Sequence, residues 1–179
     1  YELNPRIAKE FLFTGSKMGA ERAYQMGMVS FGQLEGAALR RALAHFSESI
    51  RKDPDFAPAY AWLSLTFSRQ AMNGFRTASG VADSARVLAV QALALDSELA
   101  EAHLALGCVH FRFDWDLQAA EEEFRRALAL DATLVETHIW YAHLLGFTGR
   151  ESQALTIARQ AVRADPLGLA ARAILSFGL

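Results

Sequence analysis

The sequence predicts an all-α fold, a right-handed superhelical solenoid of antiparallel helix pairs with about four units and a terminal helix. Three observations indicate this fold. Helix-forming stretches rich in alanine and leucine recur along the 179 residues. Each stretch ends at an aspartate, and the aspartates are spaced by 43, 35 and 34 residues, a period typical of stacked two-helix repeats. No alternating apolar and polar pattern of a strand stands out. The four aspartates are Asp53, Asp96, Asp131 and Asp165.

The N-terminal segment, residues 1–20, is predicted to cap the array or to link it to another domain. Asn4 followed by Pro5 is typical of a helix start, and a short helix over residues 6–13 is expected after it. Gly15 and Gly19 then separate this helix from the next one, predicted over residues 21–34.

The repeat array is predicted over residues 21–166, with units near 21–56, 57–99, 100–134 and 135–168. Residues 167–179 fit a terminal helix or the start of a further repeat. In each unit, apolar residues three and four apart form one helix stripe, which stacking on neighbouring units buries. Leu106 and Leu128 are therefore expected to be buried between helices. Small residues allow the two helices of a unit to cross closely: Gly107, Ala120, Ala142 and Ala154.

One unit is longer than the others because of residues 72–83. This stretch contains Asn73-Gly74 and Ser79-Gly80, which are typical of turns. We expect an enlarged, easily cleaved loop between the two helices of that unit. An insertion of this kind serves binding or is simply tolerated.

The repeat pattern resembles the tetratricopeptide repeat (TPR). The third unit places His103, Leu106, Gly107 and His110 on its first helix, then Ala120, Phe124 and Ala127 on its second. The TPR consensus has a large residue, leucine, glycine and tyrosine, followed by Ala-x3-Phe and a closing proline.

A narrower resemblance is to the TPR regions of bacterial multidomain signalling proteins. It rests on residues 22–25, 53–61, 113–116 and 120–127. There such regions follow a winged-helix, adenylate cyclase or Ser/Thr kinase domain. The resemblance implies a non-catalytic interaction or regulatory module, for signalling or transcription regulation, that binds a peptide, a helix or a partner domain.

The resemblance also implies a binding groove along the first helices. Leu65, Leu104, Phe111 and Ile139 are expected to form an exposed apolar stripe on it. Basic residues are missing from the groove positions, which disfavours the family's carboxylate clamp for chaperone tails. An amphipathic helix or an extended apolar segment with basic flanks fits better. The groove residues that this inference names are Phe31, Leu65, Glu101, Leu104, Cys108, Phe111, Glu136, Ile139 and His143, and Gly27 is placed beside Phe31.

Two alternatives remain open at this point. The same face could pack against another domain of the same protein or a second copy. A different class is a small-ligand sensor with a pocket at the enlarged loop and Trp115.

Catalytic, cofactor and metal sites are not predicted. His103, His110 and His138 occupy repeat positions at which packing explains them, and a metal site needs three or four converging ligands. Asp116 is expected to cap the helix that follows it, and Trp115 to pack over the turn. Cys108 is the single cysteine, so an intrachain disulfide is excluded.

Composition sets the remaining expectations. The net charge of −2 argues against direct nucleic-acid binding, and no apolar run is long enough to insert in a membrane. Because the sequence opens on Tyr1, it is expected to be a piece of a longer protein. The predicted partner is a protein or peptide, and the predicted compartment is the cytoplasm.

Overall fold

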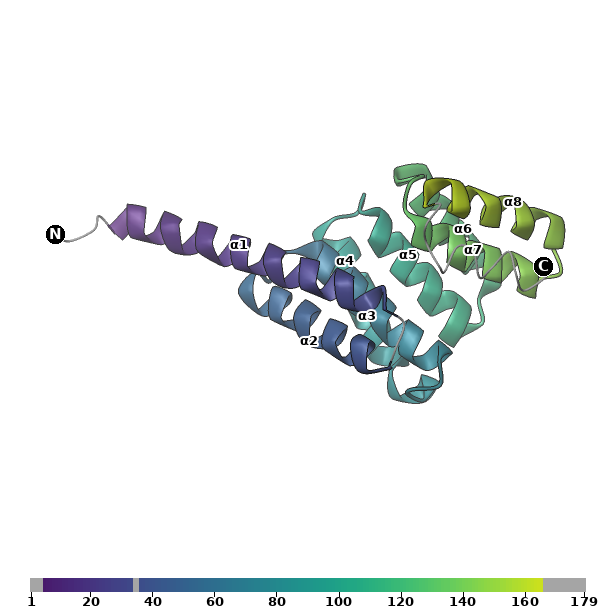
Figure 1. Cartoon of the computed structure of the whole chain (residues 1–179), viewed down its shortest axis with the longest axis horizontal. Coiled ribbons are helices and arrows are strands. Elements are labelled where there is room, and N and C mark those ends of the chain that lie inside the picture. The colour runs from purple at the N-terminus through teal and green to yellow at the C-terminus, as the bar shows by residue number, and fades with distance from the viewer. Residues whose placement is uncertain (1–4, 34–35, 166–179) are drawn as a thin grey trace.

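The computed structural model describes residues 5–33 and 36–165, and these are helical apart from short connections (Figure 1). The predicted all-α fold class is confirmed. The α-helices are α1 (Pro5–Phe31), α2 (Gly36–Lys52), α3 (Ala57–Met72), α4 (Ala82–Leu95), α5 (Ala100–Val109), α6 (Leu117–Leu130), α7 (Val135–Phe147) and α8 (Glu151–Ala164).

Consecutive helices form four pairs: α1 with α2, α3 with α4, α5 with α6, and α7 with α8. Each first helix after α1 also packs against the second helix of the preceding pair. The predicted ranges 57–99, 100–134 and 135–168 each contain one pair. Figure 1 shows α1 reaching beyond the stacked body at the N-terminal end.

Helix α1 corrects the prediction of a short helix, a break and a second helix. It runs without interruption from Pro5 to Phe31, through Gly15 and Gly19. A glycine inside a helix costs only about 1 kcal/mol relative to alanine, which packing can offset. Here α2 supplies that packing, because the Ser16 hydroxyl donates to the Lys52 carbonyl and the Ser49 hydroxyl donates to the Ala20 carbonyl at 2.9 Å.

The recurring aspartates end the second helix of each pair. The backbone N–H of Asp96, for example, donates to the Ala92 carbonyl at 2.9 Å, while its carboxylate accepts from the Glu98 N–H at 2.9 Å. Asp131 repeats this turn with Thr133 at 2.8 Å. An aspartate at these helix ends accepts a hydrogen bond from the backbone N–H two residues further on, which explains why this residue recurs with the period of the repeat.

The first and third pairs cross in the same way. A methyl group added at Gly107 would lie 2.7 Å from the Phe124 ring, and one at Gly27 would lie 2.5 Å from the Phe46 ring. Both phenylalanines are fully buried. Gly27 therefore lies at a helix crossing, which corrects its assignment to the groove.

Leu106 and Leu128 are only partly buried, although both pack against the main core. The expectation that both are buried between helices is met only in part, because each packs against the core and keeps part of its surface exposed. The fully buried positions of the third pair include Leu104, Ala120 and Phe124.

The enlarged loop of the second pair lies where the sequence predicts it. Residues 72–80 are exposed and include a short 3-10 turn, Ala78–Gly80, while α4 already begins at Ala82. Two contacts hold the loop against the helices. The Phe75 ring packs on Gly36, where an added methyl group would lie 3.2 Å from the ring, and the Arg76 guanidinium lies over the Phe67 ring.

A π-helical turn, His110–Asp114, joins α5 to α6. Trp115 follows it with a left-handed backbone (φ 58°), and the Asp116 carboxylate accepts from the Ala119 N–H at 3.0 Å. The predicted cap is confirmed. Trp115 is 63% exposed and contacts the Phe147 ring of the next pair.

Candidate binding surface

The candidate site is the inner surface that α3, α5 and α7 form as they pack side by side. Alignment of these helices on Ser64, Gly107 and Ala142 places equivalent residues in rows across the three helices. One row is Ser68 and Phe111, and the next row is Arg69, Arg112 and Phe147. The surface therefore repeats its geometry once per pair, while the side chains at equivalent positions differ.

The apolar part of this surface is buried, which corrects the expectation of an exposed stripe. Leu65 and Leu104 are fully buried, and Phe111 and Ile139 are each 6% exposed. The first three belong to the main core cluster, because most of their apolar area lies between neighbouring helices. Ile139 packs instead with Ala142 and Ala158 of the last pair.

The other predicted groove residues differ in exposure. Phe31 is 3% exposed and Cys108 is fully buried, whereas Glu101, Glu136 and His143 are partly exposed. Their role in binding a partner stays a prediction.

A buried ion pair crosses the inner surface from the second pair to the fourth. The guanidinium of Arg69 on α3 pairs with the carboxylate of Glu136 on α7, with side chains 5% and 13% exposed. The same guanidinium lies 4.2 Å from the centre of the Phe31 ring. Burial lowers the pKa of Arg69 to about 10, so this group stays charged at neutral pH.

Sequence reasoning missed Arg69 because it follows Ser68, the residue of α3 equivalent to the predicted groove residue Phe111, by one position. Arg112 follows Phe111 in the same way. The inner surface therefore holds two arginines although the consensus positions hold none. Each residue of a helix is turned by about 100° from the one before it, so the residue that follows a groove position lies at the margin of the groove. This spacing was the signal that could have identified them.

Several polar atoms here are buried without a hydrogen-bond partner in the described part of the chain. They are the Ser68 hydroxyl, the Nε of Arg69 and the Nε of Arg112. Buried polar groups in native proteins are nearly always paired, and an unpaired one costs about 1–3 kcal/mol. Within the described residues, the inner surface thus has hydrogen-bond donors without a partner.

Three titratable groups of the surface are shifted toward their neutral forms. Burial raises the pKa of the Cys108 thiol well above its usual value, although Arg69 and Arg112 oppose this. The thiol is therefore protonated and poorly nucleophilic. Burial lowers the pKa of His143, and the charges of Arg112 and Arg69 lower it further. Burial also raises the pKa of Glu101.

Tyr24 on α1 extends the inner surface into the first pair. Its ring contacts the rings of Phe46 and Phe56 at 5.9 and 5.3 Å between centroids. Burial raises the pKa of Tyr24, and the charge of Glu101 raises it further. Tyr24 is equivalent to the groove residue Leu104 once Gly27 is aligned with Gly107. It was not predicted because Gly27 itself was placed in the groove.

An aromatic cluster forms the rim beyond α5 and α7. The Phe147 ring lies 5.8 Å from the Phe111 ring and 5.7 Å from the Trp115 ring. Beside it, Arg86 donates to both carboxylate oxygens of Asp114, at 2.6 and 2.5 Å, and this lowers the pKa of Asp114. The network fixes the π-helical turn.

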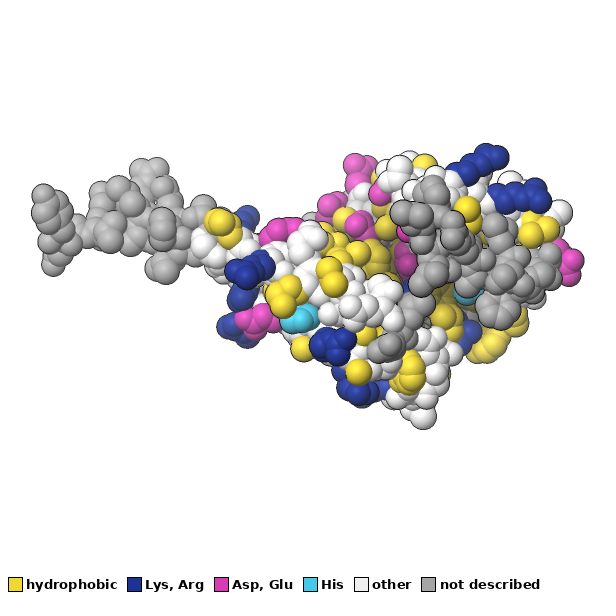
Figure 2. Space-filling model, viewed as in Figure 1, with side chains coloured by type: hydrophobic (Ala, Val, Ile, Leu, Met, Phe, Trp, Pro, Cys, Tyr) yellow, Lys and Arg dark blue, Asp and Glu magenta, His cyan; other side chains and the backbone are white. Residues whose placement is uncertain are grey.

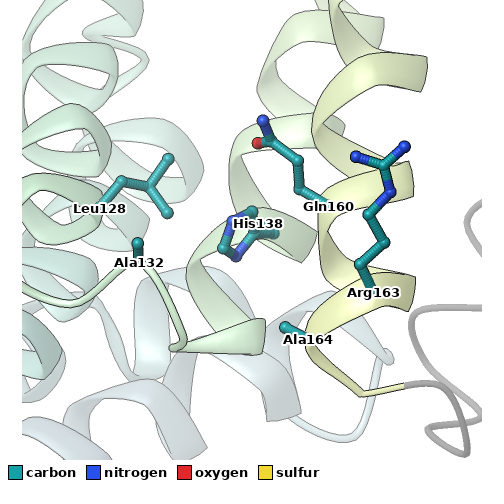
Figure 3. A pocket seen from close by; sticks show the side chains of 6 residues that line it. All are labelled: Leu128, Ala132, His138, Gln160, Arg163 and Ala164. Carbon is teal, nitrogen blue, oxygen red and sulfur yellow. The ribbon is translucent and has the colours of Figure 1, made fainter.

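A separate surface pocket of about 410 Å³ lies between α6, α7 and α8 (Figure 3). Figure 3 shows the His138 ring between Leu128 on one side and the side chains of α8 on the other. Burial lowers the pKa of His138. The lining residues are Leu128, Ala132, His138, Gln160, Arg163 and Ala164. Neither Trp115 nor the enlarged loop takes part in this pocket.

His103 and His110 contact nearby polar groups. His103 contacts the Glu123 carboxylate at 2.7 Å and the Ser97 carbonyl at 3.0 Å, and His110 contacts Asp114 at 3.0 Å. Within residues 5–33 and 36–165, no three His, Cys, Asp or Glu side chains are arranged to hold a metal ion. In the same ranges no helix combines the length and apolarity that a membrane crossing needs.

The arrangement of stacked helix pairs defines the class of fold as a TPR-like helical-repeat solenoid. Solved structures of TPR proteins share it. A thermophilic TPR protein of Thermus thermophilus, TTC0263, has a TM-score of 0.67 at 23% identity, over 88% of this chain and 80% of that one.

Two further solved structures agree. The first TPR domain of human RPAP3 has a TM-score of 0.54 at 18% identity, over 77% of this chain and 93% of that domain. The TPR domain of Arabidopsis OM64 has a TM-score of 0.53 at 17% identity, over 72% and 96%. At these identities the likeness establishes the fold. No protein-family profile matches the sequence, and neither does any curated protein.

Proposed function

We propose that the chain is a non-catalytic interaction module that binds an extended peptide segment along the inner surface of α3, α5 and α7. The observation that carries the proposal is the set of unpaired, buried donors on Ser68, Arg69 and Arg112. A peptide in extended form offers free backbone carbonyls to such donors, whereas a helix uses its carbonyls internally.

The surface also favours a particular kind of segment. Apolar side chains of the segment fit beside Phe111 and the partly exposed Phe147 ring. Glu101, partly exposed at the other end of the surface, favours a basic residue there. The peptide would approach the surface over the partly exposed side chains of Glu101, Arg112 and His143, because the apolar residues beneath them are buried.

Two observations support a binding rather than a catalytic role. The solved structures with the same fold are TPR proteins and TPR domains. The buried, protonated thiol of Cys108 lacks the activation that a nucleophile needs.

The test is selection of linear peptides from a random library, followed by fluorescence anisotropy. Arg112→Ala should weaken the selected peptides roughly tenfold or more, the loss expected for a buried charged contact. Arg159→Ala, an exposed arginine on α8, is the matched control and should leave binding unchanged. Selected peptides that bind both variants as tightly as the unaltered protein would place recognition elsewhere.

The resemblance to TPR regions of bacterial signalling proteins extends the proposal to the parent protein. The module would act in the cytoplasm as the regulatory arm of an attached effector domain, and the partner would then be a peptide of that protein or of another. The coding sequence on either side of this chain tests this part. An adjoining winged-helix, cyclase or kinase domain is expected, and a chain that stands alone would contradict it.

A further inference from the structure

A second surface emerges when the first helix of each pair is compared. The four helices are aligned on the small residue at the helix crossing, which is Gly27, Ser64, Gly107 or Ala142. For α1 and α5 the alignment is supported by the matching contacts of Gly27 with Phe46 and of Gly107 with Phe124. Three positions per helix then face the preceding pair. On α3 they are Ala59, Trp62 and Thr66, on α5 Ala102, Ala105 and Val109, and on α7 Thr137, Trp140 and Leu144.

These nine side chains are at most 3% exposed. Trp62, for example, contacts the Phe31 ring of the preceding pair at 5.0 Å. The equivalent residues of α1 are Arg22, Gln25 and Val29, and all three are exposed. Val29 is 68% exposed, and Met26 beside it is 49% exposed. The face that elsewhere packs against a helix is open on α1.

The open face is positively charged around its apolar centre. A surface pocket of about 460 Å³ lies here between α1 and α2, lined by Arg22, Gln25, Met26, Val29, Ser30, Arg41 and His45. None of these residues is acidic. Figure 2 shows hydrophobic, basic and histidine side chains next to one another over α1 and α2.

Of the neighbouring acids, Glu21 lies at the edge of this surface and Glu48 is ion-paired. Glu21 accepts a hydrogen bond from Gln25 at 2.7 Å, and Glu48 pairs with Arg51 and Lys52 at 2.6 and 3.2 Å. Arg41 donates to the amide oxygen of Gln33 at 3.0 Å rather than to a carboxylate. In the described part of the chain neither Arg22 nor Arg41 forms an ion pair.

We propose that this α1–α2 face binds an amphipathic helix whose apolar stripe is flanked by acidic residues. A helix is the occupant because the same backbone geometry accepts a helix at α3, α5 and α7. Acidic flanks follow from charge complementarity with Arg22 and Arg41. A second copy fits less well, since both faces of such a pairing would carry Arg22 and Arg41 and no acidic lining residue.

The probe is a synthetic helix of about 18 residues, or five turns, with leucines at heptad a and d positions and glutamates elsewhere. A matched peptide carries lysines in place of the glutamates. Fluorescence anisotropy should show binding of the glutamate peptide alone, weakened by added salt. Val29→Asp should reduce its affinity roughly tenfold or more. Val90→Asp on α4, where the valine is 52% exposed, is the control and should have no effect.

Charge reversal separates this proposal from unspecific apolar binding. The double variant Arg22→Glu, Arg41→Glu should lose the glutamate peptide and gain the lysine peptide. Circular dichroism checks that each variant stays helical, which is expected because all altered side chains are exposed. If Val29→Asp unfolds, the charge-reversal variant still decides the question.

Three results would overturn the proposal. One is failure of the glutamate peptide to bind, and another is equal binding of the two peptides. The third is a dimer in sedimentation equilibrium that Val29→Asp converts to a monomer, because a second copy would then occupy the face.

Discussion

The first and third helix pairs have the same internal crossing but different surroundings. In both, a glycine on the first helix receives a phenylalanine ring from the second. Yet Val109 on α5 is fully buried, while Val29 at the same repeat position on α1 is 68% exposed. The crossing is a property of the pair itself. What a position contributes to stability is decided by the neighbouring pair that covers it.

The largest loss of stability is expected when the phenylalanine ring at a helix crossing is removed. Phe124→Ala removes a fully buried ring and should lower the free energy of unfolding by about 3–5 kcal/mol. Phe46→Ala should act in the same direction at the equivalent crossing of the first pair. Urea unfolding followed by circular dichroism measures both. A loss below about 0.5 kcal/mol, the size of a surface substitution, would show that the crossings do not hold the pairs.

The second prediction concerns the ion pair between Arg69 and Glu136, which links the second and fourth helix pairs. Glu136→Gln leaves the Arg69 guanidinium buried without its counter-charge, so we expect a loss of about 3 kcal/mol. The double variant Arg69→Met, Glu136→Gln removes the stranded charge and should recover part of that loss. Equal losses in the single and double variants would mean that the two side chains are not coupled.

The two valines test the comparison directly. Val109→Ala should cost about 2 kcal/mol, because two buried methyl groups are lost and a cavity remains. Val29→Ala should change stability by less than about 0.5 kcal/mol. Chemical denaturation of the two variants side by side supplies the measurement. Similar values for both would mean that the face of α1 is covered in solution.

The smallest effect is a pH dependence from the buried histidines. Burial lowers the pKa of His138 and His143 in the folded protein below the value near 6.5 of an exposed ring. The unfolded chain therefore binds more protons just below that value. Stability should be full above pH 6.5 and fall as the pH is lowered through the folded pKa. His143→Gln should flatten this slope in urea midpoints taken between pH 7.5 and 5.5, and an unchanged slope would exclude His143 as a source.

Much of the fold followed from the sequence because its elements are local. The closing aspartates and the cap at Asp116 act within one turn of chain, and the small residues at the crossings meet the next helix of the same pair. The error at α1 has the opposite origin. Gly15 and Gly19 weaken a helix locally, but α2 packs along it and its side chains hold the backbone in place. Such long-range support is not visible in a local pattern.

The candidate site was predicted less well for a geometric reason. Consensus positions located α3, α5 and α7 on the inner surface, yet they omitted Arg69 and Arg112, which lie one residue further along. They also gave no measure of depth, so Leu65 and Leu104 were expected on the surface although both are fully buried. Depth depends on how closely successive pairs stack, and no single repeat encodes that spacing.

The ion pair between Arg69 and Glu136 changes how such an array comes apart. In a solenoid whose repeats touch only their neighbours, unfolding starts at an end and proceeds one repeat at a time, like a zipper. Here a bond spans from α3 to α7 and skips the pair between them. The third pair, which lies between these two helices, cannot unfold without separating the Arg69–Glu136 ion pair. Pulled from its ends, the second, third and fourth pairs would yield together in one step, and only the first pair could peel away alone.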